Sequence, residues 1–259
     1  MRITKNGFYK LSELLNLSFL SEGASFRTKG VPVGGGIIKI NIDDNVFAIF
    51  FDDLFLTNSL LDSVNYSSNI EIELGKSSKL EFYGVLNGKE IESNIKILQD
   101  NQYSELKVRY IILSKNLEKI KSKFYSEIGA SNTKSDIHII SIVGKDGLVD
   151  LDGIIQINNG IVKVNANLLE ENIFLGDGGK VKGIPTLLVR SNDVNASHAC
   201  RIEKISDEKL FYLRSRGIDR ENALFMMIDS YISNMFICLS MVDNIFYKEI
   251  FENIIKKIK

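Results

Sequence analysis

The stretch Ile154-Ile155-Gln156-Ile157-Asn158-Asn159-Gly160-Ile161-Val162-Lys163-Val164 (residues 154–164) shows the pattern that recurs through the middle of the chain. It contains two short apolar segments, each with one polar residue, separated only by Asn-Asn-Gly. Alternation of apolar and polar residues is typical of a half-buried β-strand, and Asn and Gly favour turns. The stretch therefore predicts two strands joined by a tight turn.

The same pattern extends over residues 37–205. Short segments rich in Ile, Val, Leu and Phe are separated by Asn, Asp, Gly and Ser, the clearest being Ile37–Ile42, Ile70–Leu74, Leu80–Tyr83, Ile95–Leu98, Ile137–Val143 and Thr186–Val189. The chain has only two prolines, so little interrupts a strand ladder. One segment departs from the pattern: Leu117–Ile128 has apolar residues at roughly helical spacing and is predicted to be a helix.

Many short strands at near-regular spacing suit a β-sandwich, a barrel or a parallel β-helix. Short separators rich in Asn and Gly, such as Asp177-Gly178-Gly179, favour the solenoid. Hydrophobic helices do not alternate with the strands, which argues against a doubly wound sheet. The strand pattern alone leaves solenoid and sandwich about equally favoured.

The flanking segments are different. Residues 1–36 are mixed, with a predicted short helix at Leu11–Leu20 and a loop at Lys29–Gly36. Residues 206–259 read as a helical domain. Ser206 and Asp219 are suited to cap two helices, the second running to about Cys238, and a third runs from about Asn244 to Lys256. The sequence thus divides into 1–36, 37–205 and 206–259, and the helical part carries surplus apolar surface that would suit a partner.

Composition narrows the class of protein. With 259 residues, 44% hydrophobic and 25% charged, the chain is long enough to build a core without disulfides. A net charge of −1 gives no basic field for nucleic acid or an anionic membrane. Two cysteines do not make a disulfide framework, so a reducing compartment is expected. Neither a signal peptide nor an apolar run of the ~20 residues that span a bilayer is evident, so a cytoplasmic protein is expected.

The strand Val194–Ile205 contains one of the two histidines, His198, and one of the two cysteines, Cys200. Residues i and i+2 of a strand share a face, about 7 Å apart. An imidazole and a thiolate so placed can share an iron ion, but iron–sulfur clusters usually take four ligands, so others must come from another strand or subunit. From the residues alone, a buried Cys200 and a hydrogen-bonded His198 of purely structural role are the more favoured interpretation.

The segment Leu210–Ile218 (LFYLRSRGI), preceded by Ser197-His198 and the acidic helix start after Ile205, resembles the SufB/SufD family of iron–sulfur cluster assembly proteins. Gly153–Ile157 and Asp193-Val194 agree as well, so the resemblance spans about Gly153 to Tyr231. It implies a right-handed parallel β-helix followed by a C-terminal helical domain.

The resemblance also implies a function. Family members are non-catalytic scaffold or accessory subunits that pair as SufB with SufD, or as homodimers, through the end of the β-helix. A SufC-like ABC-type ATPase docks on the helices and carries the ATP chemistry. The string Gly176–Val181 accordingly lacks the spacing of a phosphate loop. A transient iron–sulfur cluster, and a reduced flavin at the level of the complex, are the implied cofactors.

Carried onto this sequence, the resemblance places the functionally implicated histidine of SufD on His198. Cys200 stands where the family usually has Ala. The essential cysteine of SufB falls at or near Glu170, in a stretch without cysteine. This favours a SufD-like role, with a SufB-like homodimeric scaffold that uses Cys200 as the alternative. From the residues alone, Glu170 and Glu171 are expected to be solvated turn acids.

The remaining candidates are weighed against ordinary structural roles. The resemblance assigns partner contact to one helix end, whose alternative role is a solvated face; its residues are Leu210, Phe211, Tyr212, Arg214 and Arg216. Cys238 is expected in the core and His138 in a structural role. Two other functions remain open: a stand-alone β-helix enzyme acting on carbohydrate, which would need paired carboxylates on one face, and a polymerising solenoid, which the helical end disfavours.

Overall fold

The computed structural model describes residues 1–14, 37–53 and 65–258. In chain order the elements are β1 (Arg2–Ile3), β2 (Gly7–Lys10), α1 (Leu11–Leu14), β3 (Ile37–Ile42), β4 (Phe47–Asp52), β5 (Asn65–Leu74), β6 (Lys79–Asn87), β7 (Glu90–Gln99), β8 (Glu105–Ser114), β9 (Lys119–Ile128), β10 (Lys134–Val143), β11 (Leu148–Ile157), β12 (Val164–Phe174), β13 (Lys180–Lys182), β14 (Thr186–Val189), β15 (Val194–Lys204), α2 (Asp207–Ser215), α3 (Arg220–Val242) and α4 (Asn244–Ile258).

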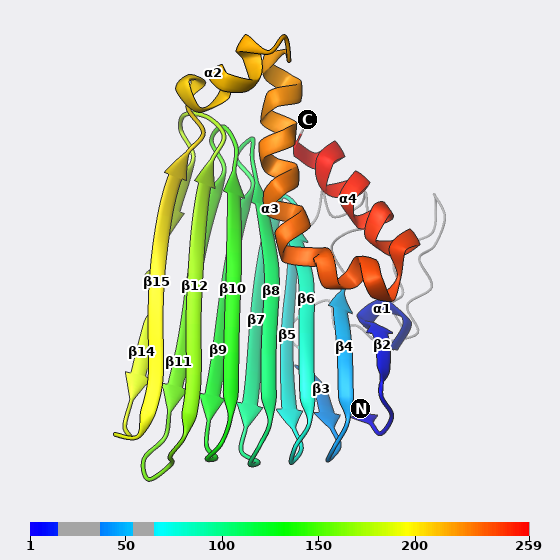
Figure 1. Ribbon diagram of the computed structural model, residues 1–259, viewed down its shortest axis with the longest axis vertical. Helices are drawn as coiled ribbons and strands as arrows, with labels where there is room; N and C mark the ends of the chain where they lie inside the picture. Colours follow the sequence, from blue (N-terminus) through cyan, green and yellow to red (C-terminus); the bar gives the residue numbers. More distant parts are fainter. Residues whose placement is uncertain (15–36, 54–64, 259) are drawn as a thin grey trace.

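The strands form two facing sheets. Sheet A has the order β1-β3-β5-β7-β9-β11-β13, with β14 also paired to β11, and sheet B has the order β15-β12-β10-β8-β6-β4-β2. Pairing is parallel throughout. From β1 to β13 each strand crosses to the opposite sheet, so the chain winds as a flattened solenoid (Figure 1). The predicted parallel β-helix followed by helices is confirmed.

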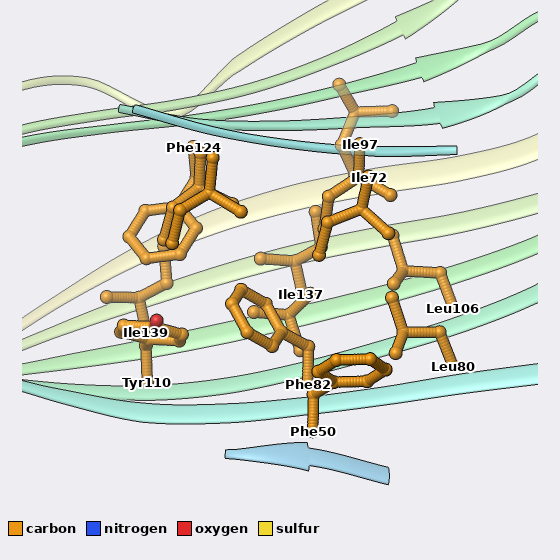
Figure 2. Close-up of a cluster of buried hydrophobic side chains, with 14 of the residues drawn as sticks. Phe50, Ile72, Leu80, Phe82, Ile97, Leu106, Tyr110, Phe124, Ile137 and Ile139 are labelled. Atoms are coloured by element: carbon orange, nitrogen blue, oxygen red, sulfur yellow. The ribbon is translucent and has the colours of Figure 1, made fainter. Parts of the chain in front are cut away.

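The core is built from columns of inward-facing side chains. In sheet B the register stacks one such column through successive strands: Phe50, Phe82, Val108, Ile137 and Leu168. All five side chains are buried, and aromatic and aliphatic groups from sheet A meet them between the sheets (Figure 2). Burying each such side chain contributes about 1.5–3 kcal/mol before the cost of ordering the chain. This column is therefore a continuous apolar stack along sheet B.

The predicted helix at Leu117–Ile128 is wrong, because this segment forms strand β9. Its inward positions alternate as Ile120, Ser122, Phe124, Ser126 and Ile128, all buried. The two serines interrupt the apolar alternation and leave the large apolar residues four apart. Four-residue spacing is also the signature of a helix face, so this sequence pattern is compatible with both a helix and a strand.

Two predicted boundaries shift. Ile154–Ile157 ends β11 as predicted, but β12 begins only at Val164, so the connection runs from Asn158 to Lys163. At the N-terminus, β1 and β2 pair with β3 and β4 and extend the sheets ahead of residue 37. Helix α1 begins the predicted Leu11–Leu20 helix, whose other residues lie outside the described ranges, as does the predicted loop Lys29–Gly36.

The helices cover part of the outer face of sheet B (Figure 1). The two predicted caps are confirmed: Ser206 Oγ accepts from the backbone N–H of Lys209, and Asp219 accepts from that of Asn222. Between the helices and sheet B lies a second apolar cluster, which joins outward-facing residues of the sheet to α3 and α4. It includes Phe51, Tyr83, Ile111, Ile140, Ile232, Phe236 and Phe246.

Within the described ranges, α3 alone is long and apolar enough, by length and composition, to cross a membrane. Its side chains Ile228, Ile232 and Phe236 are buried in the second apolar cluster. On its other face Ile237 and Met241 are 53% and 81% exposed, and 28% of the apolar window is buried.

Candidate functional site

The candidate site lies on the last strand of the β-helix. Within the described structure, β15 pairs with β12 alone and forms the end of sheet B. The register places His198 above Leu168, Cys200 above Glu170 and Ile202 above Asn172. The three β12 residues are buried and face the interior. Their β15 partners therefore take the inward-facing positions of the terminal rung, yet they are exposed.

His198 is held by a backbone contact. Its Nδ1 lies 2.7 Å from the carbonyl oxygen of Pro185, immediately ahead of β14. A carbonyl oxygen can only accept, so Nδ1 carries the proton and donates. In the neutral imidazole the Nε2 lone pair is then the one left for an incoming metal ion, and the contact fixes both tautomer and ring orientation.

Glu170 is buried beneath this surface. The residue is 1% exposed, and its Oε1 has no hydrogen-bond partner in the described structure. Burial, with a smaller contribution from the charge of Asp152, raises the pKa of Glu170 to about 7, although the backbone of Gly153 opposes the shift. The carboxyl reaches across the interior to Gly153 of β11, where a side chain would collide with it. The expectation that Glu170 is a solvated turn acid is wrong, because its position in β12 faces inward.

Cys200 has two polar neighbours from β12. Its Sγ lies 3.5 Å from Asn172 Nδ2, which donates to it, and burial together with the charge of Glu170 raises the pKa of the thiol. The thiol therefore stays protonated near neutral pH unless a cation stabilises the thiolate. Asn172 Oδ1 is a second buried oxygen that lacks a hydrogen-bond partner within the described residues.

Nitrogen, sulfur and oxygen donors thus lie along one end of the solenoid, and these donor types suit iron. Within residues 1–14, 37–53 and 65–258, no group of three His, Cys, Asp or Glu is close enough to hold a metal ion. His198, Cys200 and Glu170 therefore do not form a complete metal site in this chain. Cluster ligation here would need donors from a second chain.

The outer face of β15 connects the site to the helices. Glu203 accepts from Tyr231 of α3 (2.9 Å), and its ion pairs reach Lys209 of α2 (2.8 Å) and Arg201 (3.0 Å). Arg201 also reaches Glu171 Oε1 at 3.0 Å. Sequence reasoning missed this network. The sequence carried one hint of it: Arg201 and Glu203 are at odd positions of the strand, so they face the side opposite to His198 and Cys200.

Glu171 is also not the solvated acid that was expected. Its Oε2 lies 2.8 Å from His138 Nε2, so the carboxylate bridges β10 and β15. Burial lowers the pKa of His138, although Glu171 opposes this shift. His138 thus lies within a network of polar side chains on the outer face of sheet B.

The predicted partner-binding residues divide into two groups. Leu210 is buried in the second apolar cluster and anchors α2. Phe211 and Tyr212 are 69% and 62% exposed, Arg214 and Arg216 are exposed, and the Arg216 guanidinium lies 5.1 Å from the centre of the Tyr212 ring. Four of the five residues therefore present an aromatic and cationic surface.

Fold and site together define a parallel β-helix protein with helices packed on one sheet and a terminal rung that exposes the side chains of His198 and Cys200. The family model for the SUF system FeS cluster assembly, SufBD core domain, matches residues 56–231. The chain therefore belongs to the SufB/SufD family, as the resemblance implied.

Individual relatives agree with this assignment. The chain is 30% identical over 95 residues to the iron–sulfur cluster assembly protein SufD of Escherichia coli, covering 37% of this chain and 22% of that protein. It is 26% identical over 212 residues to SufD of Bacillus subtilis, covering 76% of this chain and 48% of that protein. It is 29% identical over 103 residues to SufB of Bacillus subtilis, covering 40% of this chain and 22% of that protein. The chain thus aligns with about half or less of these relatives' lengths.

Proposed function

We propose that this chain is a non-catalytic accessory subunit of a SUF-type iron–sulfur cluster assembly complex in the cytoplasm. Family membership and the similarity to proteins named SufD support this role. In the proposal, iron and sulfide are the cargo, and the cluster is bound only transiently. A reduced flavin, where one is used, belongs to the assembled complex.

One observation carries the proposal: the terminal rung presents ligands and apolar side chains together. Ile184 and Ile202 are 76% and 73% exposed, at the same end of the solenoid as His198 and Cys200. An edge strand also offers unpaired backbone N–H and C=O groups to another strand. A second β-helix subunit, SufB-like or identical to this chain, would cover this end and add the ligands that a cluster needs.

The helical region is proposed to bind a SufC-like ABC-type ATPase, which carries out ATP hydrolysis. Exposed aromatic and arginine side chains such as Phe211, Tyr212 and Arg216 are favoured anchors at interfaces. Glu203 would transmit a movement of α2 and α3 to β15, because it contacts both helices from the strand that carries His198 and Cys200.

Co-expression tests the assembly. The chain is produced with an ABC ATPase and a cysteine-bearing SufB-type subunit from the same genome, and complexes are weighed by light scattering after size exclusion. We expect a ternary complex, and we expect Phe211→Ala with Arg216→Ala to lose the ATPase while retaining the second β-helix. Absence of any complex in all nucleotide states would refute the proposal.

A homodimeric scaffold is the second candidate, because Cys200 supplies a thiol at the terminal rung. Anaerobic reconstitution of the isolated chain with iron and sulfide separates the two roles. The accessory role predicts only a weakly bound cluster. A stable cluster that is lost in Cys200→Ser but kept in Cys238→Ser would establish the scaffold role instead.

A further inference from the structure

The second cysteine of the chain lies against an amine. Cys238 of α3 and Lys107 of β8 are 131 positions apart in sequence, and Lys107 Nζ donates to Cys238 Sγ at 3.4 Å. Both residues are half-buried where α3 packs on the outer face of sheet B. A nitrogen that becomes nucleophilic on deprotonation is therefore close to an oxidisable sulfur, and strands β10 and β12 separate it from His198 and Cys200 of β15.

Neighbouring groups hold the amine in this position. Lys107 Nζ forms an ion pair with Glu81 Oε2 at 3.6 Å and lies 6.0 Å from the centre of the Tyr83 ring. The Tyr83 hydroxyl in turn donates to Glu81 Oε2 at 2.6 Å. The residue Glu81 is 8% exposed, so this set of contacts restrains the lysine head group beside the sulfur. Cys200, in contrast, accepts its hydrogen bond from the Asn172 amide.

We propose that Cys238 and Lys107 form an oxidation-dependent covalent link, a sulfenamide, that fastens α3 to the β-helix when a peroxide is the oxidant. In the first step the sulfur attacks the peroxide, the O–O bond breaks, and Cys238 becomes a sulfenic acid while one water is released. Sulfur is oxidised by two electrons, and the peroxide is reduced.

In the second step Lys107 loses its ammonium proton to solvent, and its Nζ attacks the sulfenic sulfur. The S–N bond forms as the S–O bond breaks, and the leaving hydroxide takes one N–H proton of the attacking amine and departs as a second water. The sum is one thiol, one amine and one peroxide giving one sulfenamide and two waters, so the protein loses two hydrogens. A thiol reductant reverses the link by attack on sulfur.

The test uses the full chain in a Cys200→Ser background, because a disulfide between the two cysteines would cause the same mass loss. After treatment with hydrogen peroxide we expect an intact mass lower by two hydrogens and a proteolytic peptide pair joining β8 to α3, both reversed by dithiothreitol. Lys107→Arg keeps the positive charge and should instead leave Cys238 as sulfenic or sulfinic acid.

Lys79→Arg is the matched control, since Lys79 also pairs with Glu81 (3.2 Å), whereas the lysine that donates to Cys238 is Lys107. It should leave the yield of the link unchanged. The proposal is overturned if Cys238 stays a thiol, if it accumulates only oxygen adducts in the unaltered Lys107 background, or if the link joins another amine. Circular dichroism of Lys107→Arg and Lys107→Gln checks that the variants are folded. The outcome does not depend on complex formation, so it is separate from the proposed function.

Discussion

Glu170 lies in the rung directly beneath Cys200, at matched positions of β12 and β15. Burial raises the pKa of the Glu170 carboxyl to about 7, and the carboxylate charge contributes to the raised pKa of the Cys200 thiol. At the end of the solenoid, burial thus disfavours both anions, and the Glu170 charge further disfavours the Cys200 thiolate. A bound iron ion would reverse this preference, because a cation stabilises both anions, so metal binding here should release protons.

The first prediction concerns pH and Glu170. Its pKa rises from 4.5 in an exposed setting to about 7 in the fold, so between these values the folded state holds more protons than the unfolded state. Stability must then fall as pH rises through this window. Relative to Glu170→Gln, the free energy of unfolding should drop by about 3 kcal/mol between pH 4.5 and pH 8. Urea denaturation across this range measures the difference.

Glu171→Gln serves as the comparison, because Glu171 is partly exposed and paired with His138 and Arg201. It should not reproduce the Glu170→Gln effect. If the wild-type and Glu170→Gln curves run parallel from pH 4.5 to pH 8, Glu170 does not titrate inside the fold as described.

The second prediction concerns Gly153. A Cβ at this position would collide with Glu170 Oε1 and lie 3.2 Å from Leu168 Cδ1. Gly153→Ala should therefore destabilise the fold by about 1–3 kcal/mol, the usual cost of overpacking. Combining it with Glu170→Ala should recover part of that loss, since the colliding carboxyl is removed. Gly176→Ala is the control, because its nearest neighbour would be 3.9 Å away. Additive losses in the double variant would contradict the contact.

The third prediction concerns assembly through β15. Ile202→Asp places a charge on a side chain that is 73% exposed, so the isolated subunit should change stability by less than about 0.5 kcal/mol. Association with a second β-helix subunit should weaken strongly, since the charge would be buried there. Ile245→Asp, on α4 and 83% exposed, should associate normally. Light scattering on mixtures with the second subunit measures the association of each variant. If Ile202→Asp and Ile245→Asp associate equally well, the interface lies elsewhere.

The fourth prediction concerns Glu203. Replacing it with Gln removes the ion pairs to Lys209 and Arg201 and weakens the contact with Tyr231. We expect a loss of about 1 kcal/mol and faster amide hydrogen exchange in α2 and the first turns of α3. Glu252→Gln, exposed on α4, should leave exchange in these helices unchanged. Protection that is identical in both variants would show that Glu203 does not couple strand and helices.

The sequence predicted the fold where side-chain alternation was clean. Apolar and polar residues alternate from Ile38 to Ile42, and Ile37–Ile42 forms β3; Ser206 and Asp219 cap helices as local hydrogen bonding requires. β9 was missed because Ser122 and Ser126 occupy inward positions, which a period-two reading treats as outward. Local pattern therefore succeeds where the interior is apolar and fails where small polar residues enter it.

The candidate site was predictable only in part. His198 and Cys200 were identified as sharing one face of a strand, because that follows from spacing alone. The burial of Glu170 depends on the register between β12 and β15 and on the space above Gly153, neither of which the local sequence specifies. The contact between His198 and Pro185 likewise joins strand β15 to the residue just ahead of β14. These features arise from tertiary packing.

In the proposed assembly, the terminal position of β15 has a consequence for the handling of iron and sulfide. A chain that docks on this strand both supplies the missing neighbour and covers His198 and Cys200, which face the interior of the solenoid. Recognition of the partner and removal of water from the ligands would then be a single event. An unassembled subunit leaves these groups in bulk solvent, so tight capture of iron would be reserved for the completed assembly.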